Sequence, residues 1–214
     1  MPISTKPRGP VENRLLAALP DEVFARLLPH LQRVSFALGD VVYESSERME
    51  RLYFPTTCIV SLLYTMTDGA TAEMGLVGND GIVGIALFMG GNTVPNRAVA
   101  PTLLEEFRRG GPCQLLLLRY TQALITQISQ TAVCNRLHAV EQRLCRWLLL
   151  TQEFIANMLG GRRESVTKAA RRLQKAGLIR YVRGYITILD RKGLEAASCE
   201  CYQVVKTEFD RLLG

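Results

Sequence analysis

The chain has 214 residues, a formal net charge of +6 and a hydrophobic content of 48%. This hydrophobic content is ample for a packed core, and the length permits one large domain or two small ones. The sequence shows neither an apolar run long enough to span a membrane nor an apolar signal segment near its start, which argues against membrane-spanning and secreted classes. We therefore expect a soluble, cytoplasmic protein.

The first hundred residues change from a helical to a strand-like pattern. Apolar spacing predicts short helices over 11–19 and 21–28. Short apolar runs then alternate with Gly, Pro, Asn and Asp turn signals, which predicts strands at 34–38, 41–44, 51–54, 58–66 and 70–77. Several short strands at close spacing indicate a β-sandwich or roll, so residues 1–111 are predicted to form a β-roll domain.

Helical periodicity returns over residues 112–150, with a break expected near Asn135. One apolar stripe of this segment consists of Leu117, Tyr120, Leu124 and Ile128. A long helix between two domains, with an apolar stripe left over, is expected to pack against its own copy. Residues 112–134 are therefore predicted to be a dimerisation helix; the alternative is a core helix packed wholly on the roll.

Residues 151–179 have the layout of a helix-turn-helix, in which Ala156 and Gly160 suit two helices that cross closely at a tight turn. The second helix has an apolar stripe at Val166, Ala169, Ala170 and Leu173. Its opposite ridge is polar and mainly cationic. Arg163 and Glu164, near the helix start, suit guanine and cytosine edges, whereas the basic residues further along suit phosphate.

A hairpin is predicted directly after this helix, with its turn at Arg183-Gly184. Residues 160–183 hold eight Lys and Arg against one carboxylate, Glu164, and such a concentrated basic patch indicates a polyanionic partner. The alternative is a solvated basic face. Residues 135–214 are therefore predicted to be a winged helix-turn-helix domain, with Thr151 as N-cap of its first helix. The predicted DNA-binding residues are Thr151, Arg162, Arg163, Glu164, Ser165, Thr167, Lys168, Arg171, Lys175, Arg180 and Arg183.

The six cysteines, at 58, 113, 134, 145, 199 and 201, do not indicate a disulfide framework or a zinc site. The sequence has no C-x-x-C, and it has only two histidines to complete a ligand set. Most of the cysteines are predicted to be small core residues, with a redox or metal pair at Cys199-x-Cys201 as the alternative. His30 and His138 are expected to be structural or exposed, so we assign no metal site.

A β-roll, a long helix and a C-terminal winged helix, in this order, resemble the Crp/Fnr family of bacterial transcription regulators. The resemblance is strongest over residues 150–179, where Arg163-Glu164-Ser165-Val166 matches the R-E-[TS]-V that opens the family's recognition helix, and Lys168 falls at its third base-reading position. The resemblance implies an α+β fold with a cyclic-nucleotide-binding-like roll. It further implies a homodimer that senses a small molecule, binds near-palindromic double-stranded DNA and acts on RNA polymerase.

The family's phosphate-binding cassette, G-E-x-G followed by R-[ST], resembles Gly81-Ile82-Val83-Gly84 and Arg97-Ala98. Ile82 cannot accept a hydrogen bond from a ribose hydroxyl, and Ala98 lacks the hydroxyl that would hold a cyclic phosphate. A cyclic nucleotide is therefore not expected, and no cofactor is assigned. By this resemblance the candidate effector-binding residues are Gly81, Gly84, Arg97, Ser129 and Gln130.

Paired carboxylates, a nucleophile–base set and a P-loop are not apparent, so we expect no enzymatic activity. The alternative function is a small-molecule-binding or redox-sensing module in which DNA binding is secondary or lost. Two junctions look too short: the roll lacks further strands before Pro101, and no residues connect two helices after Leu150. We therefore hypothesise omitted segments near 100–101 and 149–151.

Overall fold

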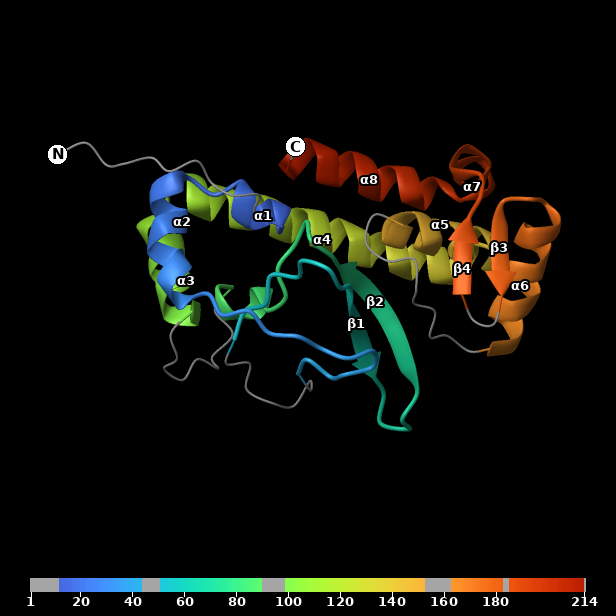
Figure 1. The fold of residues 1–214 in the computed structure, drawn as a ribbon, viewed down its shortest axis with the longest axis horizontal. Helices are drawn as coiled ribbons and strands as arrows, with labels where there is room; N and C mark the ends of the chain where they lie inside the picture. Colours follow the sequence, from blue (N-terminus) through green and yellow to red (C-terminus); the bar gives the residue numbers. More distant parts are fainter. Residues whose placement is uncertain (1–11, 44–50, 90–98, 153–162, 183–184, 214) are drawn as a thin grey trace.

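The computed structural model describes residues 12–43, 51–89, 99–152, 163–182 and 185–213. Helices dominate these segments, accompanied by two small antiparallel sheets, so the expected α+β class is confirmed. A long central helix, α4 (Gly111–Leu137), connects the two halves of the molecule (Figure 1).

The chain begins with two short helices, α1 (Arg14–Ala17) and α2 (Asp21–Leu27), and the 3-10 turn η1 (Leu28–His30), close to the bounds predicted from the sequence. Asn13 caps α1, because its Oδ1 accepts a hydrogen bond of 3.0 Å from the Leu16 N–H. Its fully buried amide also donates to the carbonyls of Pro55 and Gly81, at 2.8 and 2.9 Å. One side chain thus ties the first helix to two loops of the strand region.

In the strand region, the described residues form one hairpin, of β1 (Val60–Thr65) and β2 (Thr71–Val77), followed by the 3-10 turn η2 (Ile85–Leu87). Val60 lies opposite Val77, and the register shifts between Leu62 and Leu63. These strands confirm two of the five predicted. The strand predicted at 51–54 is reduced to an isolated bridge between Tyr53 and Val83.

The strands predicted at 34–38 and 41–44 are not found among the described residues, which include 34–38 and 41–43. The turn between them does form: the Asp40 N–H donates to the Ala37 carbonyl at 3.2 Å, and the Asp40 carboxylate accepts from the Ala37 N–H at 2.7 Å. Alternating apolar and polar residues favour an extended backbone, but a strand also needs a neighbouring strand that forms hydrogen bonds with its backbone N–H and C=O groups. Residues 34–38 are exposed, Val42 and Tyr43 are partly exposed, and no strand in the described part of the chain pairs with either segment.

Helices α3 (Val99–Arg109) and α5 (Val140–Gln152) run without interruption through residues 100–101 and 149–151. The omission of segments at these two points stays a hypothesis, because a helix through a junction does not show whether residues once lay between its two sides. Proline is tolerated in the first turn of a helix, so Pro101 fits near the start of α3. The break predicted near Asn135 falls slightly later, between α4 and α5.

The apolar stripe predicted for the dimer interface lies inside this chain. Leu117, Tyr120 and Leu124 are at most 2% exposed and form one core cluster with residues of α1, α2 and α3. Within the described residues, the alternative of a core helix is thus correct for this face. The apolar residues that α4 leaves exposed are a different set: Leu115, Leu118, Ile125, Val133 and Leu137.

The C-terminal half contains α6 (Arg163–Lys175), the hairpin of β3 (Ile179–Val182) and β4 (Tyr185–Ile188), α7 (Arg191–Ala197) and α8 (Glu200–Leu213). Residues of α5, α6, α7 and the hairpin share a second core. Figure 1 shows α8 running back along α4, on the side away from β1 and β2. Over the described segments, no helix is both long enough and apolar enough to cross a membrane.

Candidate nucleic-acid interface

Helix α6 separates its apolar and cationic residues as predicted. Ala169, Ala170 and Leu173 are buried in the C-terminal core. Lys168, Arg171 and Lys175 are exposed, and Thr167 is partly exposed. The side chains of Arg163, Glu164 and Ser165, and all of Arg162, lie outside the residues that the structure describes. The described part of α6 therefore presents a row of three cations to its surroundings.

The end of α6 is held by a glycine turn and by one amide side chain. Gly177, with φ of 75°, adopts the left-handed conformation that commonly ends a helix. The Leu178 N–H donates to the Leu173 carbonyl at 3.0 Å. Gln174 Oε1 accepts from the Tyr181 N–H at 2.6 Å, which joins α6 to the hairpin.

An ion pair between Arg172 and Glu141 joins α6 to α5. Arg172 thus flanks the cationic row but already has a carboxylate partner. The three cations Lys168, Arg171 and Lys175 therefore sit on a helix that is held on both sides, by the hairpin and by α5.

The predicted wing is present. In β3, Ile179 is buried and Arg180 is exposed, and they pair with Ile188 and Thr187 of β4. Because successive strand residues point to opposite faces, Ile179 anchors the hairpin in the core and leaves Arg180 outside. The turn residue Arg183 lies outside the described residues.

Thr151 is not an N-cap in the structure, because it lies in the last turn of α5 and is buried. Its hydroxyl donates to the carbonyls of Trp147, at 2.9 Å, and Leu148, at 3.2 Å. The hydroxyl of a threonine within a helix commonly donates a hydrogen bond to a backbone carbonyl of the preceding turn. Thr151 is therefore engaged inside the helix, and a direct phosphate contact from its side chain has no support.

Residues 98–197, which run from α3 to α7, match the family model described as the Crp-like helix-turn-helix domain. Over these residues the chain is similar to the helix-turn-helix domain of the Crp/Fnr family. Among curated proteins, none matches this sequence significantly.

Two solved structures resemble this chain over most of its length. One is a putative transcriptional regulator of the Crp/Fnr family from Eubacterium rectale, with 15% identity, a TM-score of 0.60, and coverage of 87% of this chain and 98% of that one. The other is a putative cAMP-binding regulatory protein from Silicibacter pomeroyi, with 21% identity, a TM-score of 0.54, and coverage of 86% and 94%. At these identities, the two likenesses show a shared fold.

The first part of the Crp/Fnr-like cassette, residues 81–84, is used for packing. A Cβ on Gly81 would lie 2.5 Å from the hydroxyl oxygen of Tyr120, and that hydroxyl donates to the Ile82 carbonyl at 3.1 Å. Ile82 and Val83 are fully buried, as are the two glycines, and Gly84 has a left-handed φ of 112°. Ile82, which replaces the family's glutamate, thus packs in the hydrophobic core.

Two of the remaining effector candidates, Ser129 and Gln130, fall within the residues that the structure describes. On α4, Ser129 is exposed and Gln130 is partly exposed, while Arg97 lies outside the described residues. A pocket of about 110 Å³ lies between α8 and the N-terminal half, and its walls include Leu76, Gln127 and Phe209. None of Gly81, Gly84, Ser129 and Gln130 lines it.

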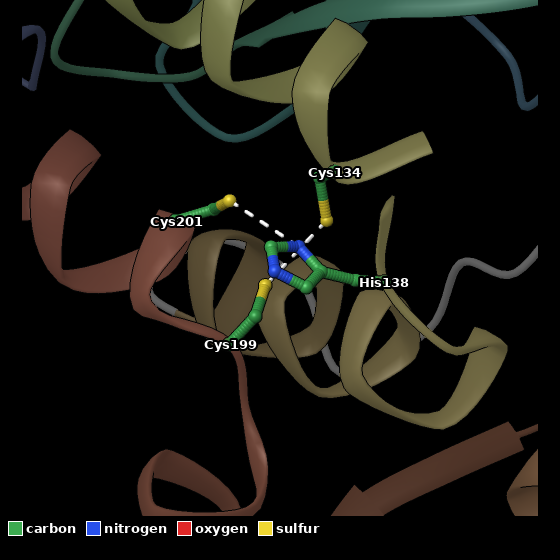
Figure 2. Close-up of side chains that lie close together, drawn as sticks. All are labelled: Cys134, His138, Cys199 and Cys201. Carbon is green, nitrogen blue, oxygen red and sulfur yellow. Dashed lines mark hydrogen bonds between the residues drawn. The ribbon is translucent and has the colours of Figure 1, made fainter. Parts of the chain in front are cut away.

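The structure corrects one conclusion about the cysteines. All six are free thiols, and Cys145 and Cys113 are buried as predicted. However, Cys134 in the last turn of α4 and His138 directly after that helix lie close to Cys199 and Cys201 at the start of α8 (Figure 2). The prediction of no metal site considered only the spacing of cysteines and histidines along the chain. The four side chains that could bind a metal come from two segments that are distant in sequence.

Proposed function

We propose that this chain is a homodimeric, non-enzymatic transcription regulator of the Crp/Fnr type that binds double-stranded DNA through α6 and the β3–β4 hairpin. The observation that carries the proposal is the exposed row Lys168, Arg171 and Lys175, opposite the buried Ala169 and Ala170. The wider proposed interface comprises Arg162, Arg163, Glu164, Ser165, Thr167, Arg180 and Arg183.

The geometry of the cationic row suits a DNA groove. Lys168, Arg171 and Lys175 are spaced three and four residues apart, so they share one ridge of α6 that extends over about 10 Å. In helix-turn-helix proteins the N-terminal part of the recognition helix meets base edges, while residues on its flanks meet the backbone. We therefore assign base reading to Arg163, Glu164 and Lys168, and phosphate contacts to the other cations.

The proposed dimer interface is the apolar face that α4 leaves uncovered within one chain. Leu118 and Ile125, at 48% and 46% exposed, are seven residues apart, and Leu115 precedes Leu118 by three. Spacings of three and seven residues form the seam of a two-helix coiled coil. A second copy of this chain therefore fits the face better than an unrelated partner, because a two-fold axis along α4 repeats the same seam.

A dimer of this kind presents two copies of α6 to DNA. Helix-turn-helix dimers contact half-sites about one helical turn apart, so the operator is expected to be near-palindromic. A small-molecule or redox signal in the N-terminal half would reach α4 through Tyr120, which packs on Gly81 and bonds to Ile82. The proposal places the dimer in the cytoplasm, with RNA polymerase as the partner affected by the bound regulator.

Binding-site selection from a random duplex pool, using the full chain, tests this proposal. A near-palindromic consensus and affinity that falls steeply with salt are expected. In titrations on the selected site, Arg171→Ala should weaken binding uniformly and reduce the salt slope by about one, as for loss of one phosphate contact. Arg163→Ala should instead relax the preference at one base pair, by about 1–3 kcal/mol.

Arg108→Ala is the matched control, because Arg108 is an exposed arginine on α3, outside the proposed interface. It should leave both affinity and salt slope unchanged. If the pool yields no consensus and the chain binds duplexes without salt dependence, the regulator proposal is wrong. A small-molecule-binding or redox-sensing module would then be the better description.

A further inference from the structure

Three thiols and one imidazole meet where α4 ends and α8 begins. Cys134 lies in the last turn of α4 and His138 follows that helix directly, while Cys199 precedes α8 and Cys201 lies in its first turn. Their ligand atoms all lie within 4.8 Å of one another, and the three cysteines are buried. Figure 2 shows the three sulfur atoms around the His138 ring.

We propose that Cys134, His138, Cys199 and Cys201 bind one Zn²⁺ ion in a tetrahedral, structural site. Thiolate and imidazole are the preferred ligands of zinc, and a site closed by four protein ligands is typical of structural zinc. The inference does not depend on DNA binding, because it concerns only the joint between α4, α5 and α8.

The distances suit a single ion. Zn–S bonds of about 2.3 Å and Zn–N bonds of about 2.0–2.1 Å place two tetrahedral sulfur ligands about 3.8 Å apart, and sulfur and nitrogen about 3.6 Å apart. Cys134 Sγ lies 3.5 Å from Cys199 Sγ, and Cys201 Sγ lies 3.5 Å from His138 Nδ1. An iron–sulfur cluster distributes its ligands over several iron atoms and needs wider spacing. The cluster of four side chains is therefore sized for a mononuclear site.

The surroundings of His138 are those of a metal ligand. Its Nδ1 faces Cys201, and its Nε2 lies 3.3 Å from a carboxylate oxygen of Glu200. A metal-bound histidine usually donates its other ring N–H to a carboxylate or carbonyl, which fixes the tautomer and the ring orientation. Glu200 thus occupies the position of an orienting carboxylate.

The charge of the proposed site is also balanced. Three thiolates and one Zn²⁺ leave a net charge of −1, and a buried charge needs a partner of opposite sign. Arg146 is 7% exposed, and its Nε is a buried nitrogen without a hydrogen-bond partner. Its positive charge lies close enough to Cys134 and Cys201 to act on both sulfur atoms. Metal binding displaces the protons of cysteine ligands, so the site would hold three thiolates.

Arg146 also connects the site to the long helix, because its guanidinium donates to the Thr131 hydroxyl at 2.8 Å. Cys134 and His138 lie at the point where α4 ends and α5 starts towards the helix-turn-helix. A metal bound here would pin α8 to α4 and fix this joint.

Metal analysis of the full chain tests the proposal. Protein produced with zinc in the medium should contain one Zn²⁺ per chain. Metal-free, reduced protein titrated with Co²⁺ should saturate at one equivalent, with thiolate-to-cobalt charge transfer and the d–d absorption of tetrahedral cobalt. Cys201→Ser and His138→Ala should weaken metal binding by more than about 100-fold, since loss of an orienting partner alone costs about 10–100-fold.

Two further variants make the outcome decisive. Cys113→Ala removes a buried thiol of the N-terminal core, outside the site, and should keep full metal binding. Glu200→Gln changes a side chain that is 75% exposed, so it tests the site even if a ligand variant fails to fold, and it should weaken binding at least about 10-fold. Wild-type protein without stoichiometric metal, an iron–sulfur absorption spectrum, a Cys134–Cys199 disulfide, or equal loss in the Cys113→Ala control would overturn the proposal.

Discussion

Gly81→Ala is the sharpest test of how the Crp/Fnr-like cassette is used in this chain. A methyl group at this position would lie 2.5 Å from the Tyr120 hydroxyl oxygen and 2.8 Å from its Cε2 atom. Tyr120 is 1% exposed and packs edge-on to the Phe209 ring, so its ring has little room to retreat. The substitution therefore forces either the ring or the Gly81 loop to move.

The cost can be worked from these contacts. Overpacking a filled core costs about 1–3 kcal/mol. Displacing the ring also breaks the bond from the Tyr120 hydroxyl to the Ile82 carbonyl, and a buried polar group left unpaired costs about 1–3 kcal/mol. We expect Gly81→Ala to lower the free energy of unfolding by about 2–4 kcal/mol.

Urea unfolding followed by far-ultraviolet circular dichroism measures this change. Tyr120→Phe alone should cost about 1 kcal/mol. It removes the nearest clashing atom, so Gly81→Ala should cost about 1 kcal/mol less in that background than in the wild type. A Gly81→Ala variant within about 0.5 kcal/mol of wild type, or strict additivity in the double variant, would refute the packing role.

Three further predictions follow from other parts of the fold. Buried Glu106 accepts two hydrogen bonds from Arg26, which hold the pKa of its carboxyl below the ordinary value. The resulting stability is present above the ordinary carboxyl pKa and is lost as the pH falls through the lowered pKa. Glu106→Gln should therefore lower the urea midpoint at neutral pH, and the difference between the two midpoints should disappear in acid. Leu118→Glu and Ile125→Glu should shift sedimentation towards the monomer, and an unchanged mass would contradict the α4 interface. Gly177→Ala should cost about 1 kcal/mol in thermal unfolding and Gly177→Asn less, because the position has open space but a positive φ; equal costs would speak against the left-handed cap.

Local patterns predicted the C-terminal half well. The separation of Ala169, Ala170 and Leu173 from the cations of α6 follows from helical periodicity alone, and the hairpin follows from β-branched residues about a glycine turn. The short helices near the start were predictable for the same reason. These features depend on neighbours within a few residues, so the order of residues is enough to specify them.

Patterns failed where a partner segment had to be known. The residues at 34–38 alternate as strand residues do, but no neighbouring strand completes a sheet with them in the described part of the chain. The stripe Leu117, Tyr120 and Leu124 is equally apolar whether it faces a second copy or the chain's own core. Periodicity reports that a face is buried, and only the packing shows what buries it.

The amino-acid sequence by itself determined the helix-turn-helix, its basic ridge and the substitution of Ile82 and Ala98 in the cassette. Tertiary structure alone decided the cysteine cluster, because Cys134 and His138 share one helix end while Cys199 and Cys201 lie far along the chain. The i, i+4 spacing of Cys134 and His138 and the nearby C-x-C were the only local signals. A metal site needs ligand atoms within a few ångströms in space, a condition that the return of α8 along α4 meets and that sequence spacing does not express.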